Sequence, residues 1–146
     1  MADPASILAL VSASLTITMR AASVGKSLYT LRSKYQKADK KVQQLSSHVS
    51  AIRVATRSLS SWLEAEAVRS EEVAEVKDEL LHVLRACYEL LSDLEDYVSR
   101  AITGAEFLTF KGRVSFLWNA DVIQETTQTL HQQETAILLI LQTLKM

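Results

Sequence analysis

The stretch that decides the fold is "EEVAEVKDELLHVLRACYELLSDLEDYVSRAIT", residues 71–103. Its apolar side chains recur every three or four residues, which is the spacing of an α-helix. One apolar seam runs through Leu80, Cys87 and Leu94, and a second runs beside it through Leu84 and Leu91. Because two adjacent seams make a wide apolar face, this helix is predicted to pack against at least two neighbours.

The rest of the chain has the same helical character. Of its 146 residues 48% are hydrophobic, and only three are Gly and one is Pro. High apolar content with so few chain-breaking residues favours an all-α protein. Helices are expected over about residues 4–35, 38–67, 71–103 and from residue 119 onward, with a short helix or turn in 105–118. Residues 1–146 are therefore predicted to form a single helical-bundle domain of four long helices plus a short one.

The first two helices are also expected to present an apolar face to the core. In the second helix a heptad-like seam with one polar member is predicted to be buried: Val42, Leu45, Val49, Ile52, Thr56, Leu59 and Leu63. In the first helix an apolar series keeps roughly helical spacing: Leu8, Val11, Leu15, Ala22, Leu28, Leu31 and Tyr35.

The charges are segregated along the chain although the net charge is only −1. Residues 20–57 hold nine Lys or Arg and one acid, whereas residues 64–96 hold eleven acids and three basic residues. One interpretation is two antiparallel neighbours with complementary charge. The other is a basic surface in "RSKYQKADKK", residues 32–41, that faces anionic lipid through Lys34, Lys37, Lys40 and Lys41. Nucleic acid is not expected as a partner, because the net charge is not basic and no recognition motif accompanies the patch.

The sequence gives no support for an enzyme. Gly25-Lys26-Ser27 resembles the end of a phosphate-binding loop, but that loop needs a glycine five positions earlier, where this chain has Arg20. Cys87, the single cysteine, cannot form an internal disulfide and fits a reducing compartment. It lies on the inner seam of its helix, where a thiol behaves as a small inert apolar group. We therefore expect no catalytic residue, no cofactor and no small-molecule substrate.

The histidines do not form a metal-binding motif in the sequence. Glu79 with His82 and His131 with Glu134 are close pairs three residues apart, but in opposite order, and His48 has no carboxylate near it along the chain. A di-iron bundle needs two such pairs in the same order and two further inward-facing carboxylates. No metal site is expected on that ligand count.

The uncharged segment "ILALVSASLTITM", residues 7–19, is the most unusual in the chain. A secretory signal is excluded because the only early charge is Asp3, and the run is too short and too rich in hydroxyls for a permanent membrane anchor. Either this helix is buried on most sides, or it must tolerate two environments, since hydroxyls cost less than charges to bury in lipid or in an oligomer. The candidate interface residues are Ile7, Leu8, Leu10, Val11, Leu15, Ile17 and Met19.

Two short motifs resemble a known family. "MADPASILAL", residues 1–10, is similar to the start of the fungal N-terminal domains of NOD-like (STAND) receptors, in particular the HeLo-like group. "RVSFLW", residues 113–118, followed by "LHQQETAILLILQTL", residues 130–144, resembles the aromatic turn and closing helix of those domains. The resemblance implies a helical bundle that is the N-terminal module of a longer signalling protein.

The family resemblance also implies a function. In the HeLo-like group the domain is an effector of regulated cell death, incompatibility and innate immunity: oligomerisation of the receptor frees the first helix, which inserts in the plasma membrane. The expected partners are therefore a second copy of the chain and an anionic membrane, and the expected location is the cytoplasm with recruitment to the plasma membrane. The alternative is a cytosolic protein–protein interaction bundle that homodimerises or binds a partner helical domain without any membrane activity.

Overall fold

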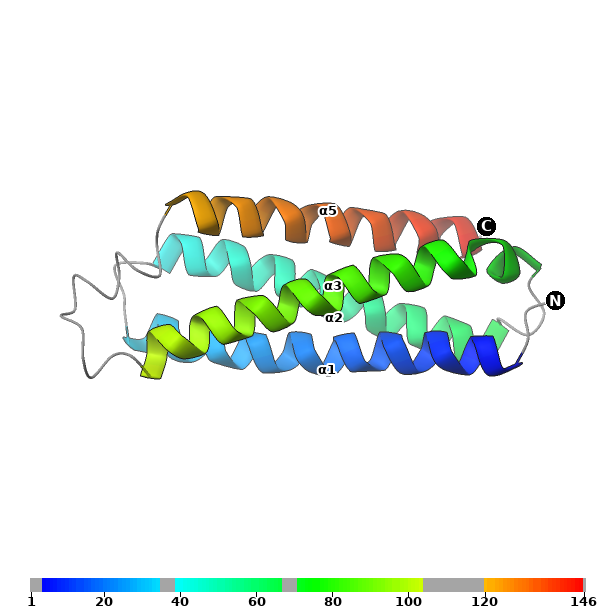
Figure 1. The fold of residues 1–146 in the computed structure, drawn as a ribbon, viewed down its shortest axis with the longest axis horizontal. Helices are drawn as coiled ribbons and strands as arrows, with labels where there is room; N and C mark the ends of the chain where they lie inside the picture. Colours follow the sequence, from blue (N-terminus) through cyan, green and yellow to red (C-terminus); the bar gives the residue numbers. More distant parts are fainter. Residues whose placement is uncertain (1–3, 35–38, 67–70, 104–119, 146) are drawn as a thin grey trace.

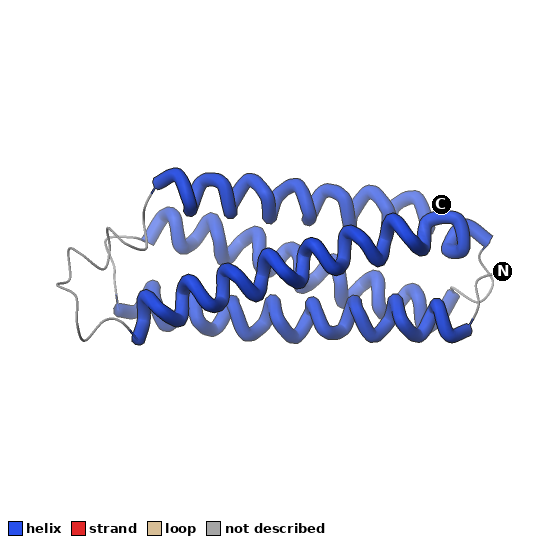
Figure 2. The backbone as a smooth tube through the Cα atoms, viewed as in Figure 1, coloured by secondary structure: helices blue, strands red, loops and turns tan. Residues whose placement is uncertain are grey.

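A computed structural model describes residues 4–34, 39–66, 71–103 and 120–145. All of the described residues are helical, in α1 (Pro4–Lys34), α2 (Asp39–Glu66), α3 (Glu71–Thr103) and α5 (Ala120–Lys145) (Figures 1 and 2). The predicted all-α bundle with four long helices is thus confirmed. The short element expected within residues 105–118 lies outside the described residues.

The four helices lie side by side, each antiparallel to the next along the chain (Figure 1). α1 packs against α2 and α3, and α5 packs against the same two helices from the other side. α2 and α3 therefore occupy opposite corners of the bundle. The basic segment 20–57 meets the acidic segment 64–96 where α1 packs against α3, and there Arg20 pairs with Glu95. These two helices run parallel and not antiparallel as expected (Figure 1). The acidic α3 lies against α1 and α5, whereas the basic α2 lies diagonally across the bundle from it.

The apolar seams of α2 and α3 build the core. Every predicted seam residue of α2 is buried, from Val42 to Leu63, and this includes the polar Thr56. In α3 both predicted seams are buried and partly buried apolar residues flank them, so that α3 contacts two neighbours as expected. The buried α3 residues are Val73, Leu80, Leu84, Cys87, Leu91, Leu94 and Val98.

The apolar series expected along α1 does not coincide with its buried face. Leu8 and Leu15 are 69% and 43% exposed, Ala22 is half-buried, and Tyr35 lies outside the described residues. The buried face follows a regular alternation of three and four residues that includes two small side chains, Ser14 and Ala21. Ser14 is tolerated at a buried position because its hydroxyl donates a hydrogen bond of 2.8 Å to the carbonyl of Leu10. The buried face consists of Ile7, Leu10, Val11, Ser14, Ile17, Ala21, Val24, Leu28 and Leu31.

Candidate functional site

The outer face of α1 is the candidate functional surface. Among the described residues seven large apolar side chains are exposed, and four of them lie on α1. Three of these, Leu8, Leu15 and Met19, are separated by seven and four residues, so they project from the same side of the helix. Tyr29, 71% exposed, lies further along the helix and about 80° around its axis from Met19. We call Leu8, Leu15 and Met19 the outer stripe.

The structure divides the seven candidate interface residues into two groups. Leu8, Leu15 and Met19 belong to the outer stripe, with Met19 the most exposed at 73%. The other four lie in the core of the bundle: Ile7, Leu10, Val11 and Ile17. The segment 7–19 is therefore apolar on both sides, and only one side is used by the fold.

The charge of α1 has a single sign. Between Pro4 and Lys34 the helix contains four basic residues, Arg20, Lys26, Arg32 and Lys34, and no acidic residue. All four follow the uncharged segment. Arg20 pairs with Glu95 of α3, whereas Lys26 is exposed. Of the other predicted lipid-facing residues, Lys40 and Lys41 lie in the first turn of α2 and Lys37 lies outside the described residues.

A partly exposed polar cluster joins α1 to α3 beside the buried face of α1. The guanidinium of Arg20 donates hydrogen bonds to Glu95 at 2.5 Å and to the hydroxyl of Tyr88 at 3.1 Å, and it lies 5.4 Å from the centre of the Tyr88 ring. Ser23 donates to the second carboxylate oxygen of Glu95 at 2.5 Å. The hydroxyl of Ser23 and then the guanidinium of Arg20 hold the pKa of Glu95 below its usual value. We call Arg20, Ser23, Tyr88 and Glu95 the Glu95 cluster.

A second polar contact joins α1 to α2. The hydroxyls of Thr18 and Thr56 are hydrogen bonded to each other at 2.8 Å. The hydroxyl of Thr18 also contacts the carbonyl of Ser14 in its own helix, and that of Thr56 contacts the carbonyl of Ile52. Thr56 is fully buried, so its hydroxyl needs these partners. Together with the Glu95 cluster, this contact fixes the rotation of α1 and so determines which of its faces is exposed.

α1 also passes the test of length and composition for a membrane-spanning helix over residues 4–33. The uncharged run alone was expected to be too short to span, but the helix continues past Arg20 and remains apolar for longer than that run. Only 39% of the most apolar 18-residue stretch of this helix is buried in the bundle. A buried core helix can pass the same test, so this property alone does not assign a location.

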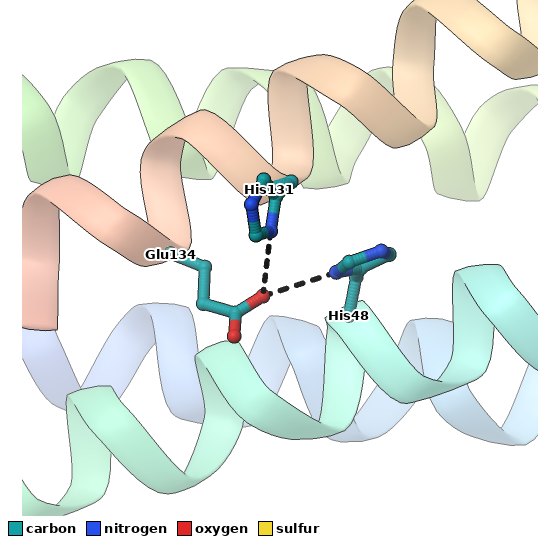
Figure 3. Close-up of side chains that lie close together, drawn as sticks. All are labelled: His48, His131 and Glu134. Carbon is teal, nitrogen blue, oxygen red and sulfur yellow. Dashed lines mark hydrogen bonds and ion pairs between the residues drawn. The ribbon is translucent and has the colours of Figure 1, made fainter.

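A second cluster of functional side chains lies between α2 and α5. His48 of α2 and His131 of α5 both direct their Nδ1 atoms at one carboxylate oxygen of Glu134, at 3.0 Å and 4.0 Å (Figure 3). The two imidazole rings meet edge to face with centres 5.4 Å apart. The side chain of Glu134 is 17% exposed, that of His48 26% and that of His131 64%.

Sequence reasoning noticed the His131–Glu134 pair but missed its third member. His48 and Glu134 are 86 positions apart, and only the parallel packing of α2 and α5 brings them together. One signal was present in the sequence: Glu134 interrupts the apolar spacing of Leu130, Ile137 and Leu141 with a charge. A charged residue at a seam position requires a polar partner from the facing helix.

Cys87 shows no sign of reactivity. Its side chain is fully buried, and burial raises the pKa of the thiol to about 12. Since the thiolate is the nucleophilic form, a thiol with this pKa stays protonated and unreactive at neutral pH. Its position agrees with the prediction that it behaves as a small apolar core residue.

Comparisons with protein-family models, with curated proteins and with solved structures found no match for this chain. No activity or partner can therefore be transferred to it from a relative. The similarity to the HeLo-like group stays an interpretation of two short motifs.

Proposed function

We propose that this domain is a non-enzymatic signalling module that docks on an anionic membrane through the outer stripe of α1. The observation that carries the proposal is the exposure of Leu8, Leu15 and Met19 on one side of a helix that contains no acidic residue. A helix with an apolar stripe and basic flanks lies in the interface of an anionic bilayer, with the apolar side chains inserted and the basic ones near the headgroups.

The first step needs no change in the fold. The outer stripe is exposed while α1 remains packed, so its apolar side chains can enter the headgroup region directly. Lys26 is exposed on the same side of α1, between Met19 and Tyr29, where its ammonium group can reach lipid phosphates. Each basic residue close to an anionic leaflet contributes on the order of 1 kcal/mol.

Insertion of α1 would be a second, activated step. Seven large apolar side chains of α1 are buried in the bundle, and each is worth about 1.5–3 kcal/mol, so exposing them all costs on the order of 10 kcal/mol or more. The Glu95 cluster and the Thr18–Thr56 bond would break as well. Without a trigger α1 therefore stays packed in the bundle. Insertion requires an event such as oligomerisation that supplies the free energy needed to release α1.

The wider role follows from the family resemblance. An N-terminal module of a fungal NOD-like receptor would be held in the cytoplasm and recruited to the plasma membrane when the receptor oligomerises, leading to regulated cell death. The exposed outer stripe and the single charge sign of α1 support this role, because both suit a helix that meets a membrane.

The alternative is a cytosolic bundle that homodimerises. One observation favours it: α5 exposes two consecutive leucines, Leu138 and Leu139, at 45% and 57%. α5 does not pack against α1, so membrane docking through α1 leaves these leucines unused. An apolar patch of this kind on a soluble domain is a contact site for another protein chain.

Vesicle sedimentation tests the proposal. The wild-type chain should pellet with vesicles of phosphatidylserine and phosphatidylcholine and remain in solution with phosphatidylcholine alone. The triple variant Leu8→Gln, Leu15→Gln, Met19→Gln should lose binding. The matched control is Val54→Gln, Leu138→Gln, Leu139→Gln, which removes three exposed apolar residues elsewhere and should bind as wild type does.

Other results would contradict membrane docking. All six substituted residues are exposed, so circular dichroism should show intact helices in both variants. Wild-type protein that stays in solution with anionic vesicles would refute the proposal. A concentration-dependent dimer that only the Val54, Leu138, Leu139 variant abolishes would support the homodimerising bundle instead.

A further inference from the structure

We propose that His48, His131 and Glu134 form a binding site for Zn²⁺ that connects α5 to α2. The proposal is independent of the membrane function, because the three residues lie on helices other than α1. Two imidazole nitrogens and one carboxylate oxygen are presented from two facing helices, and the three ligand atoms all lie within 4.8 Å of one another (Figure 3).

The ligand atoms are close to the geometry that zinc requires. With Zn–N and Zn–O distances of about 2.0–2.1 Å, ligand atoms in a tetrahedral site are roughly 3.3 Å apart. The 3.0 Å distance from His48 Nδ1 to Glu134 and the 4.0 Å distance from His131 Nδ1 to Glu134 bracket this value. The remaining pair has to close somewhat, and His131 can turn because most of its side chain is exposed.

The chemistry of the ligands selects the metal. Ca²⁺ and Mg²⁺ prefer sets made only of oxygen, whereas imidazole suits Zn²⁺, Cu²⁺ and Ni²⁺. Two His and one Glu is a ligand set found for zinc, with water completing the tetrahedron. The partial exposure of His48 and Glu134 provides the access that such a water needs.

The fold supplies the backbone support for this site. His131 and Glu134 are three residues apart on α5 and so share one side of the helix. His48 precedes the buried Val49 on α2, which fixes the backbone from which its ring projects. A carboxyl group at a seam position of α5 needs a polar partner from the facing helix, and a bound cation would supply one.

Because the ligands come from two helices, the metal binds the folded chain and not the unfolded one. A ligand at about a hundred times its dissociation constant should raise the unfolding midpoint of a domain of this size by about 5–10 °C. Calorimetry should give one Zn²⁺ per chain, and Co²⁺ at the same site should develop visible absorption typical of nitrogen and oxygen ligands.

Matched variants test the assignment with the full chain. His131→Gln and Glu134→Gln should each weaken zinc binding by about tenfold or more and reduce the shift of the unfolding midpoint. The controls are His82→Gln, which removes the third histidine from the exposed face of α3, and Glu125→Gln, which removes an exposed acid of α5. Both controls should bind zinc as wild type does.

Three outcomes would overturn the proposal. The first is no heat of zinc binding with the wild-type chain in metal-free buffer. The second is equal binding by wild type and the two site variants, or a loss of binding in His82→Gln. The third is half a zinc per chain together with a zinc-dependent dimer, which would place the metal between two molecules rather than between α2 and α5.

Discussion

Truncation of two neighbouring apolar residues of α1 should change the stability of the bundle by very different amounts. Ile17 is 1% exposed and Met19 is 73% exposed, although both belong to the same uncharged segment. Ile17→Ala removes core contacts and should reduce the free energy of unfolding by about 2–5 kcal/mol. Met19→Ala removes an exposed side chain and should change that free energy by no more than about 0.5 kcal/mol.

Urea unfolding followed by far-ultraviolet circular dichroism measures the difference. In thermal unfolding of a domain of this size, the cost of Ile17→Ala corresponds to a decrease of about 5–20 °C in the midpoint temperature. The dependence of the free energy on urea should stay unchanged, since neither variant alters the surface exposed on unfolding by much. Equal destabilisation by the two substitutions would refute the assignment of the buried face of α1.

Substitutions of Ile17 and Met19 also distinguish membrane docking from insertion of α1. Ile17→Ala reduces the free energy needed to free α1 by about 2–5 kcal/mol, which raises the population of the released helix about 30-fold or more. Dye release from anionic vesicles should therefore increase. Met19→Gln should decrease it, because in the proposed mechanism this residue contacts lipid during both docking and insertion. The control is Ile137→Ala, which destabilises the bundle at α5, a helix that α1 does not pack against, and should leave dye release closer to wild type. An increase in dye release as large for Ile137→Ala as for Ile17→Ala would contradict a specific release of α1.

Three further predictions concern side chains at the contacts between helices. The pKa of Glu95 is lowered in the folded state, so its contribution to stability is present above about pH 4.5 and is lost as pH falls through the folded pKa. Unfolding midpoints of wild type and Glu95→Gln should therefore differ most at neutral pH and converge in acid. Cys87, with a pKa of about 12, should resist iodoacetamide at pH 8 in the native chain and react fully in urea, as mass spectrometry would show. Thr56→Val removes the bond to Thr18 while keeping the shape of the side chain, and should reduce the free energy of unfolding by about 1 kcal/mol in urea titrations.

The sequence was most informative where one side of a helix is apolar and the other is charged. In α2 that contrast is strong, and all seven predicted seam residues are buried. In α1 the contrast fails, because Leu8 and Leu15 on the outer side are as apolar as Leu10 and Ile17 on the inner side. The regular repeat through Ser14 and Ala21 was the better guide, since small residues permit close packing and the hydroxyl of Ser14 bonds within its own helix.

Sequence patterns did not predict which helices contact one another when they are far apart along the chain. Heptad spacing predicts which side of each helix is buried, but it does not fix which helix that side meets. The diagonal placement of α2 and α3 and the meeting of His48 with Glu134 both depend on that missing information. Glu134 at an apolar seam position was a local signal that a polar partner lay opposite, but nothing in the sequence near it identified His48.

The outer stripe is best explained by a contact outside the fold. An exposed leucine by itself is ordinary on a protein surface. Here Leu8, Leu15 and Met19 share one side of α1, and no charged residue interrupts them. Lysine or glutamate at these positions would stabilise an exposed helix equally well and would keep the chain more soluble. The bundle gains almost nothing from the stripe, so its apolar character supports the proposal of a partner surface. The exposed Lys26 on the same side of the helix is the feature that favours an anionic membrane as that surface.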